Sequence, residues 1–292
     1  MSMMSRLLER GTLALEKAEV LDHAADVGQR LTGRLKPGPA KDLLSGTPAG
    51  HPVHPVLVTV PIGALTGAVA LDALGGNAAA SRRLIGLGIL SALPAAAAGL
   101  SDWHDTQGAE RRVGVVHALC NTAGLALFTG SWVVRGRGSG GRLLAVAGLG
   151  VIGVSGWLGG HLTYALGVGV DTTAFQTPPT EWTDACAEND LDGDAPLHVT
   201  VADTPLLLLR HRRDVRVLGD RCTHRGAPLH EGRVVDGCIE CPWHASRFSL
   251  EDGAVERGPA TRPAPVFEAR VVDGRVQVRR HEPRTLRTNP VS

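Results

Sequence analysis

The sequence predicts a chain of two parts, an α-helical membrane bundle of four transmembrane helices followed by a small all-β domain. Charged side chains occupy 11 of the 118 residues 53–170 and 48 of the other 174. Four long apolar runs lie in the charge-poor part, and short β-type runs follow it. This asymmetry is typical of a membrane segment joined to a soluble domain. The net charge of +1 provides no basic excess, so we expect no nucleic-acid partner.

Residues 1–50 form a polar N-terminal segment with seven Lys/Arg and six Asp/Glu residues. Small apolar residues recur at roughly helical spacing from Ala14 to Leu31, which predicts a helix lying on a surface. A solvated amphipathic helix and a helix on a membrane surface both fit this spacing. The first ten residues contain no long apolar stretch, so we expect no cleavable export signal.

Four apolar runs in residues 51–170 predict the transmembrane helices, because about 20 apolar residues cross the hydrocarbon core. The runs are Val56–Leu74, Leu84–Leu100, Val113–Val134 and Leu143–Gly160. Asp72 is their single charged residue, and Pro94 should kink the second helix. Short arginine-bearing loops connect the runs. Because four spans are an even number, both ends of the bundle lie on one side of the membrane. A soluble bundle is the alternative, but no polar face recurs within the runs.

Glycines in these runs predict where the helix backbones approach each other. Gly63 with Gly67, and Gly156 with Gly160, have the GxxxG spacing of closely packed membrane helices. Residues 148–153 match a dinucleotide-binding pattern, but no strand precedes them, so we interpret them as a packing face.

Residues 171–180, which include Thr177-Pro178-Pro179, are interpreted as a linker. Short runs rich in β-formers follow: Leu197–Val201, Leu206–Arg210, Val215–Leu218, Pro265–Val272 and Arg275–Val278. Asp273-Gly274 between the last two runs is a hairpin signal. The pattern predicts an all-β domain over residues 181–280 and a C-terminal tail over 281–292.

Two segments of the β domain each offer one thiolate and one imidazole. Cys222 and His224 come first, and Cys241 and His244 follow after 16 residues. Four such ligands suit either zinc or a two-iron, two-sulfur cluster. Zinc sites favour CxxC or HxxxH knuckles within one loop, whereas this split suits a cluster with both cysteines on one iron and both histidines on the other. Cys238 completes a CxxC with Cys241, but it also fits an apolar strand residue.

These two segments resemble the Rieske family, and the resemblance covers roughly residues 181–280. It extends to Arg225-Gly226, to Ser246, and to Gly258-Pro259-Ala260, which resembles the proline loop of the family. The resemblance implies a [2Fe-2S] cluster with Cys222 and Cys241 on a buried iron and His224 and His244 on an exposed one. It also implies that Arg225, Ser246 and Pro259 surround the cluster.

Departures from the family pattern indicate the ferredoxin-like type. Ala227 and Trp243 stand where Rieske proteins of quinol:cytochrome c reductases carry two disulfide-forming cysteines, so no oxidising compartment is needed. Ala245 replaces a common glycine, and Phe248 stands where high-potential members carry a tyrosine. Ser246 can still donate a hydrogen bond to a cluster sulfur, so we expect an intermediate reduction potential.

The length of the chain bears on a comparison with Rieske terminal oxygenases. Those enzymes add a mononuclear iron, held by two histidines and a carboxylate, in a large domain after the cluster. Only 12 residues follow Arg280 here. We therefore expect an oxidoreductase subunit and not a complete terminal oxygenase.

The membrane half resembles a family of four-helix membrane domains, the DUF2231 type, over about residues 48–170. The shared motifs are His51-Pro52-Val53-His54-Pro55, Gly99-Leu100-Ser101-Asp102-Trp103, His117 with Asn121, and Gly159-Gly160-His161. The helix order brings these histidines to one side of the membrane. Two interpretations stay open: a haem b or quinone site that involves His54, His117 and His161, or histidines that cap helix ends.

Together these features predict a multi-pass protein of the cell membrane that carries single electrons. Its donor would be quinol or haem, and its acceptor an unidentified redox partner protein. A redox-sensing or transport membrane protein with a regulatory cluster is one alternative, and a ferredoxin component serving a separate oxygenase is another. Because the loop disulfide and an export signal are both missing, we expect the β domain in the cytoplasm.

Overall fold

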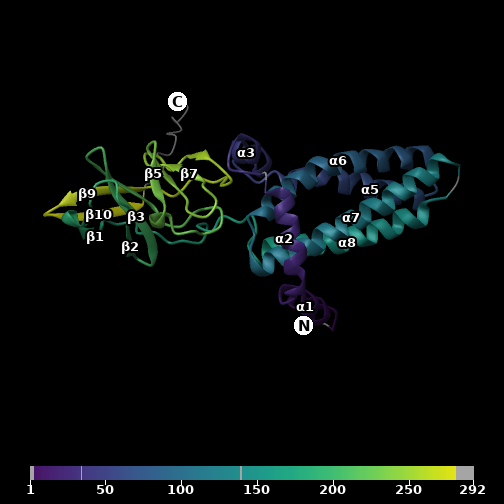
Figure 1. The fold of residues 1–292 in the computed structure, drawn as a ribbon, viewed down its shortest axis with the longest axis horizontal. Coiled ribbons are helices and arrows are strands. Elements are labelled where there is room, and N and C mark those ends of the chain that lie inside the picture. Colours follow the sequence, from purple (N-terminus) through teal and green to yellow (C-terminus); the bar gives the residue numbers. More distant parts are fainter. Residues whose placement is uncertain (1–2, 34, 139, 281–292) are drawn as a thin grey trace, which may run out of the picture. The chain divides into compact units, whose positions relative to one another are not determined.

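The computed structural model describes residues 3–33, 35–138 and 140–280 (Figure 1). The expected tail, 281–292, lies outside the described residues. The chain divides into two compact units. The first, the membrane unit, holds the residues up to Lys36 together with Leu43–Val170, and the second, the β unit, holds Pro37–Asp42 and the residues from Asp171 onward.

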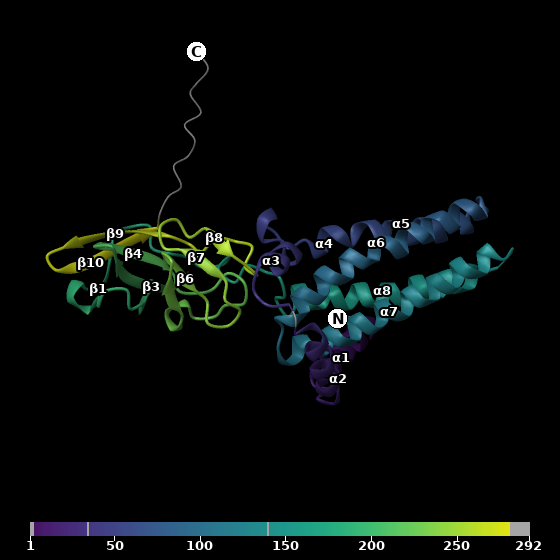
Figure 2. The ribbon, with the colours of Figure 1, turned by 45° about the horizontal axis from the view of Figure 1, so that its top comes forward.

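Four helices of the membrane unit are long and apolar enough to cross a bilayer, as predicted. The first span consists of α4 (His54–Leu57) and α5 (Thr59–Ala73); the others are α6 (Ala78–His104), α7 (Gly108–Gly136) and α8 (Arg142–Tyr164). In Figures 1 and 2, α5 lies along α6, and α7 lies along α8. The core between them includes Leu65, Ile85 and Phe128.

The second span is longer than its apolar run, because the helix continues through charged residues at both ends. The run Leu84–Leu100 has 17 residues, whereas α6 has 27 and contains Pro94 within it. Asn77 caps its start by accepting hydrogen bonds from two backbone N–H groups, at 2.8 and 3.3 Å. A capped helix end satisfies its own backbone, so the helix can begin before the apolar run does.

Close helix contact occurs at Gly148, in the run 148–153 predicted as a packing face, but not at the GxxxG residues Gly63 and Gly156. A Cβ added at Gly63 or Gly156 would meet no heavy atom of the described chain within 4 Å, so these GxxxG positions are not contact points within the bundle. The contact lies between Gly124 of α7 and Gly148 of α8. A Cβ on either residue would lie 3.2–3.3 Å from the carbonyl oxygen of the other. Spacing identifies a small-residue face but not which helix covers it.

The N-terminal segment is helical, as expected, but it forms α1 (Met3–Glu16) and α2 (Val20–Thr32) rather than one continuous helix. Two arginines at the start of α7 hold α2. Arg112 contacts both carboxylate oxygens of Asp22 at 2.7 Å, and Arg111 contacts Asp26 at 2.8 Å. The polar segment thus binds the charged end of the bundle. The short helices α3 (Pro39–Ser45) and η1 (Thr47–Ala49) follow.

The β unit contains three antiparallel sheets. The first has the order β1-β10-β9, the second β2-β3-β4 and the third β5-β6-β7-β8. The strands of the first two are β1 (Thr183–Ala187), β2 (Leu197–Val201), β3 (Thr204–His211), β4 (Asp214–Gly219), β9 (Phe267–Val272) and β10 (Arg275–Arg280). Those of the third are β5 (Arg233–Val235), β6 (Cys238–Glu240), β7 (Arg247–Ser249) and β8 (Val255–Arg257). Two short 3-10 helices, η2 (Glu188–Asp190) and η3 (Leu229–Glu231), complete the unit.

The sequence predicted five of these ten strands. The hairpin at Asp273-Gly274 is confirmed, because β9 and β10 pair with Val272 opposite Arg275. Strand β1 and the third sheet were missed, and each strand of the third sheet has only three residues. One hydrophobic core of the unit contains Cys222 and Cys241 beside Phe248, so the two predicted thiolate ligands are anchored in packed apolar side chains.

Candidate metal centre

The two segments that carry the predicted ligands fold into matching loops. In each loop the N–H of the cysteine donates to the carbonyl of the residue five positions later, at 2.9 Å for Cys222 and 2.8 Å for Cys241. The carbonyl of each cysteine accepts from the N–H four positions later, at 2.8 and 3.1 Å. The pattern turns both loops back tightly and presents one thiol and one imidazole from each.

The tight turn in each loop needs a left-handed residue. Gly226 provides it in the first loop with φ of +77°, and Ala245 provides it in the second with φ of +59°. Glycine adopts this region without a steric penalty, whereas a Cβ costs about 1–2 kcal/mol there. The departure from the common glycine at 245 therefore leaves the turn intact but strained.

The four predicted ligands come together as a thiol pair and an imidazole pair. Cys222 and Cys241 are 1% and 2% exposed, and each thiol influences the protonation of the other. The rings of His224 and His244 lie edge to face with centroids 5.1 Å apart, and their Nδ1 atoms are shielded from solvent. Sulfur donors at one end and nitrogen donors at the other match the division of ligands in a two-iron cluster of the Rieske type.

Protonation of these side chains is set by burial and by their mutual contacts. Interaction with the Cys241 thiol and burial raise the pKa of the Cys222 thiol, whereas interaction with Cys222 lowers the pKa of Cys241. Burial, with the neighbouring His244, lowers the pKa of His224 well below its ordinary value. His224 is therefore a neutral imidazole, the form that binds a metal.

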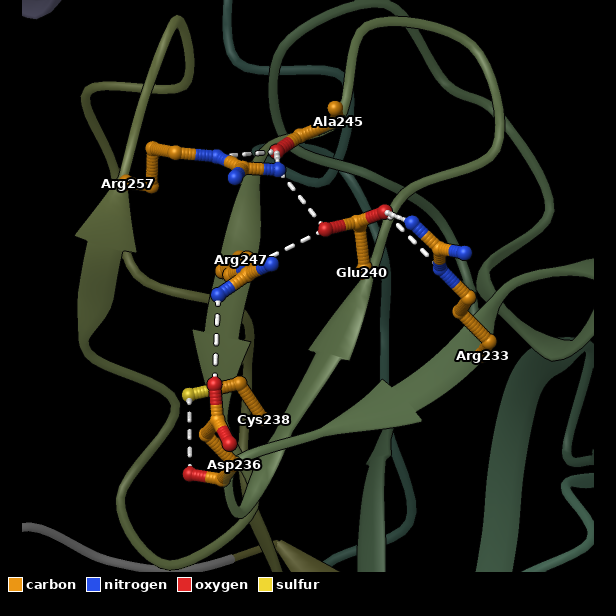
Figure 3. Close-up of polar contacts among 7 residues, drawn as sticks. All are labelled: Arg233, Asp236, Cys238, Glu240, Ala245, Arg247 and Arg257. Carbon is orange, nitrogen blue, oxygen red and sulfur yellow. Dashed lines mark hydrogen bonds and ion pairs between the residues drawn. The ribbon is translucent and has the colours of Figure 1, made fainter. Parts of the chain in front are cut away.

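Cys238, the residue that favoured zinc, is not part of this group. It lies on β6, it is 8% exposed, and its Sγ lies 4.0 Å from the carbonyl oxygen of Asp236 (Figure 3). Burial raises the pKa of its thiol. Cys238 is therefore a strand residue, and the CxxC spacing with Cys241 does not create a knuckle.

Ser246 and Pro259, predicted beside the cluster, join the second loop to the proline loop. Ser246 is fully buried, and its Oγ accepts the backbone N–H of Ala260 at 3.0 Å. Its hydroxyl proton is then available to another acceptor. Pro259 follows Gly258 through a cis peptide bond. Arg225 follows His224 in the first loop and is half-buried.

Two further residues support the loops and were missed in the sequence. The hydroxyl of Thr172 donates to the carbonyl of Cys222 at 2.8 Å. The carboxylate of Asp42, in the short stretch of the N-terminal segment that belongs to the β unit, accepts the N–H of Gly258 at 3.0 Å. Burial raises the pKa of Asp42 although this hydrogen bond opposes the shift. No local pattern marks either residue, because each contact joins segments distant in the chain.

The buried carboxylate of Glu240 stabilises the second loop through a network of arginine side chains (Figure 3). Glu240, directly before Cys241, accepts hydrogen bonds from Arg233 at 2.8 Å, Arg247 at 2.8 Å and Arg257 at 2.7 Å. Arg257 also donates to the carbonyl of Ala245, at 2.7 and 3.0 Å. Burial alone would raise the pKa of Glu240, but hydrogen bonds from Arg247 and Arg233 and the charge of Arg257 outweigh it and lower the pKa to about 2. The network holds the left-handed turn of the loop.

The three histidines predicted for a haem or quinone site each contact another helix. His54 Nδ1 lies 2.8 Å from the carbonyl oxygen of Ala95. His161 Nε2 lies 2.9 Å from Glu16. His117 is held at both ring nitrogens: Nδ1 lies 2.8 Å from the carbonyl of Ser155, and Asn121 lies 3.1 Å from Nε2. These contacts are those of helix-linking histidines, and the haem or quinone site stays a prediction.

Two family models match the chain. The Rieske [2Fe-2S] domain matches residues 181–268, and the predicted membrane protein family DUF2231 matches residues 50–172. The first match contains the two ligand loops, and the second contains the four apolar helices. Both resemblances inferred from the sequence motifs are therefore confirmed.

Similar proteins include the anthranilate 1,2-dioxygenase ferredoxin subunit of Burkholderia cepacia, 35% identical over 83 residues, which are 28% of this chain and 77% of that protein. Apoptosis-inducing factor 3 of Homo sapiens is 32% identical over 74 residues, which are 25% of this chain but only 12% of that protein. Among solved structures, a chain from a complex of reduced oxygenase and oxidised ferredoxin in carbazole 1,9a-dioxygenase is 32% identical, with a TM-score of 0.33, and the match covers 35% of this chain and 97% of that one.

These matches give the cofactor as a [2Fe-2S] cluster and the β unit as the part that carries it. The ferredoxin subunit is matched over most of its length, so the likeness extends over a whole cluster domain and not only over two short motifs. The chain belongs to the Rieske [2Fe-2S] family, and it carries a DUF2231-type membrane domain before its Rieske domain.

Proposed function

We propose that this protein is a membrane-anchored Rieske carrier that passes single electrons from a membrane donor to a separate partner protein. Cys222 and Cys241 would hold the buried iron, and His224 and His244 the outer one. The observation that carries the proposal is the separation of a fully buried thiol pair from a half-buried imidazole pair. When bound there, the cluster supplies a one-electron change without bond-making chemistry.

The residues around the ligands have roles that follow from their contacts. The core around Cys222 and Cys241 excludes water from the sulfur end of the site. Ser246 is positioned with a free hydroxyl proton, because its oxygen already accepts from Ala260. Such donors to cluster sulfurs raise a reduction potential, and Phe248 adds none because it is a buried apolar ring. An intermediate potential follows from this set.

Electrons would enter or leave through the imidazole end. Trp243 is 52% exposed and lies beside His244, with ring centroids 6.4 Å apart. An exposed indole next to an outer ligand gives a partner protein an apolar contact, as buried aromatic anchors do at many interfaces. The similarity to an oxygenase ferredoxin subunit favours an oxygenase as one candidate acceptor.

The orientation proposed places the β unit in the cytoplasm. None of the five cysteines is in a disulfide, so the loops need no oxidising compartment to fold. The membrane donor would be quinol or a haem at the histidine end of the bundle. Absence of a Soret band and of any redox response to quinone in the purified protein would exclude both donors.

The test is electron transfer by the full chain in liposomes that contain a reduced quinone, with an added one-electron acceptor. We expect reduction of the acceptor by the unaltered protein and none by His224→Gln, whose β unit lacks an outer ligand. Trp243→Ala keeps all four ligands, so it should retain the cluster and slow only transfer to a protein acceptor. If His224→Gln instead changed ion or solute flux while electron transfer continued, the carrier function would be wrong and the sensing or transport function would be favoured.

A further inference from the structure

A second group of metal-ligand side chains lies in the β unit, apart from the predicted iron ligands. His198 on β2, Asp220 directly after β4 and His230 in η3 place their donor atoms within 4.8 Å of one another. Nδ1 of His198 lies 2.7 Å from Oδ2 of Asp220, and Nδ1 of His230 lies 2.6 Å from the same oxygen. The two rings have centroids 4.8 Å apart.

The carboxylate at the centre of this group is fixed before any ligand binds. Asp220 is 3% exposed. Its backbone N–H donates to the carbonyl of Pro205 at 2.9 Å, its carbonyl accepts from Leu229 at 2.7 Å, and its Oδ1 accepts the N–H of His230 at 2.7 Å. Oδ2 is therefore held in place with two imidazole nitrogens aimed at it.

The imidazoles, in contrast, are open to solvent on one side. The side chain of His198 is 40% exposed and that of His230 is 30% exposed. A neutral imidazole can carry its proton on Nε2 instead of Nδ1, and Nδ1 can then bind a metal while the ring stays neutral. The exposed side leaves room for water in the remaining coordination positions.

We propose that His198, Asp220 and His230 bind a divalent first-row transition-metal ion. Two imidazole nitrogens and one carboxylate oxygen are a donor set for zinc and its neighbours, at about 2.0–2.2 Å from the metal. The donor atoms already converge within 4.8 Å, and small side-chain movements would bring them to the separations of about 3 Å found in such a coordination shell. Each ligand comes from a different element, so the ion would fasten together β2, the end of β4 and η3.

An ion bound at this group should stabilise the neighbouring ligand loop. Asp220 lies two residues before Cys222, and His230 lies just after the loop that carries Cys222 and His224. The ion would close the base of that loop. Because it binds only the folded chain, it should raise the temperature at which the β unit unfolds.

The test is zinc titration of the full chain, purified in detergent with its cluster in place, by calorimetry at matched iron content. We expect His198→Gln, a substitution of the most exposed ligand, to remove one zinc site or to weaken it at least about tenfold. The matched control is His211→Gln, because His211 Nδ1 contacts Asp194 at 2.8 Å but forms no triad. The control should bind zinc as the unaltered protein does.

X-ray absorption at the zinc edge separates this site from the cysteines. We expect nitrogen and oxygen neighbours at about 2.0–2.1 Å and no sulfur at about 2.3 Å in the loaded protein. Equal zinc stoichiometry and affinity in His198→Gln and His211→Gln would overturn the proposal. Sulfur in the zinc shell would overturn it too, because the bound ion would then be at a thiol.

Discussion

Replacing Glu240 with Gln should destabilise the cluster-bearing sheet strongly, although the substitution preserves size and shape. Glu240 is 7% exposed and accepts charged hydrogen bonds from three arginines. Its pKa falls from 4.5 to about 2 in the folded chain. A shift of about 2.5 units corresponds to about 3 kcal/mol in favour of the folded, ionised form. The amide loses this contribution and leaves the arginines facing an uncharged group.

The assay is loss of the visible absorption of the cluster on heating, with the full chain in detergent. For a domain of about 100 residues, a change of 1 kcal/mol moves the unfolding temperature by roughly 4–8 °C, so we expect a fall of at least about 10 °C. Glu256→Gln is the matched control, because Glu256 is exposed on β8, the edge strand of the same sheet. Surface changes of this kind stay within about 0.5 kcal/mol. Equal unfolding temperatures for the two variants would refute the reasoning.

The contribution of Glu240 to stability should also depend on pH, in a direction that its lowered pKa determines. The folded pKa of Glu240 lies below its unfolded value, so its contribution is complete above about pH 4.5 and is lost as the pH falls towards 2. The unfolding temperatures of the unaltered protein and of Glu240→Gln should therefore approach each other as the pH is lowered from 5 to 3. A constant difference would mean that packing, not charge, causes the loss.

Three further perturbations test single contacts. Ala245→Gly should stabilise the second loop by up to about 1 kcal/mol, because residue 245 has a positive φ. The midpoint for thermal loss of the cluster should therefore rise. A lower midpoint would contradict the inference that Ala245 is strained. Thr172→Val removes the hydrogen bond to the Cys222 carbonyl and should cost about 1 kcal/mol in the same assay, whereas Thr183→Val, at an exposed hydroxyl, should change little. The hydrogen bond to Arg112 lowers the pKa of Asp22, so protection of the α2 amides from hydrogen exchange should decrease as the pH falls below about 4. In Asp22→Asn these amides should be less protected already at neutral pH. Protection that does not change with pH in the unaltered chain would disprove the link.

The transmembrane helices could be predicted because lipid imposes a simple rule on the sequence. Long apolar runs with few charges mark each span, but the run for α6 began too late and ended too early, because the helix extends through Arg82 and Asp102. Helix contacts were less predictable. Gly148 lies in the 148–153 run that was interpreted as a packing face, but its partner Gly124 has no distinguishing spacing, and the GxxxG residue Gly63 meets no neighbouring helix in the described chain.

The ligand loops could be predicted because their chemistry is local, with one cysteine and one histidine within four residues. The support behind them is not local. The side chains of Thr172 and Asp42 each form one hydrogen bond to the site, across 50 and 216 residues. The arginines around Glu240 come from three strands, each of only three residues and too short to stand out in the sequence as β-structure. Side chains that position a site from a distance become visible only when the register of the strands is known.

Mössbauer spectroscopy of the iron-57-labelled full chain tests the central claim most directly, since it separates the two irons by their ligands. The account predicts iron and acid-labile sulfide in equal amounts and two signals of equal area, one from an iron with sulfur ligands and one from an iron that also has nitrogen ligands. A single iron environment, or zinc in the ligand loops in place of iron and sulfide, would contradict it.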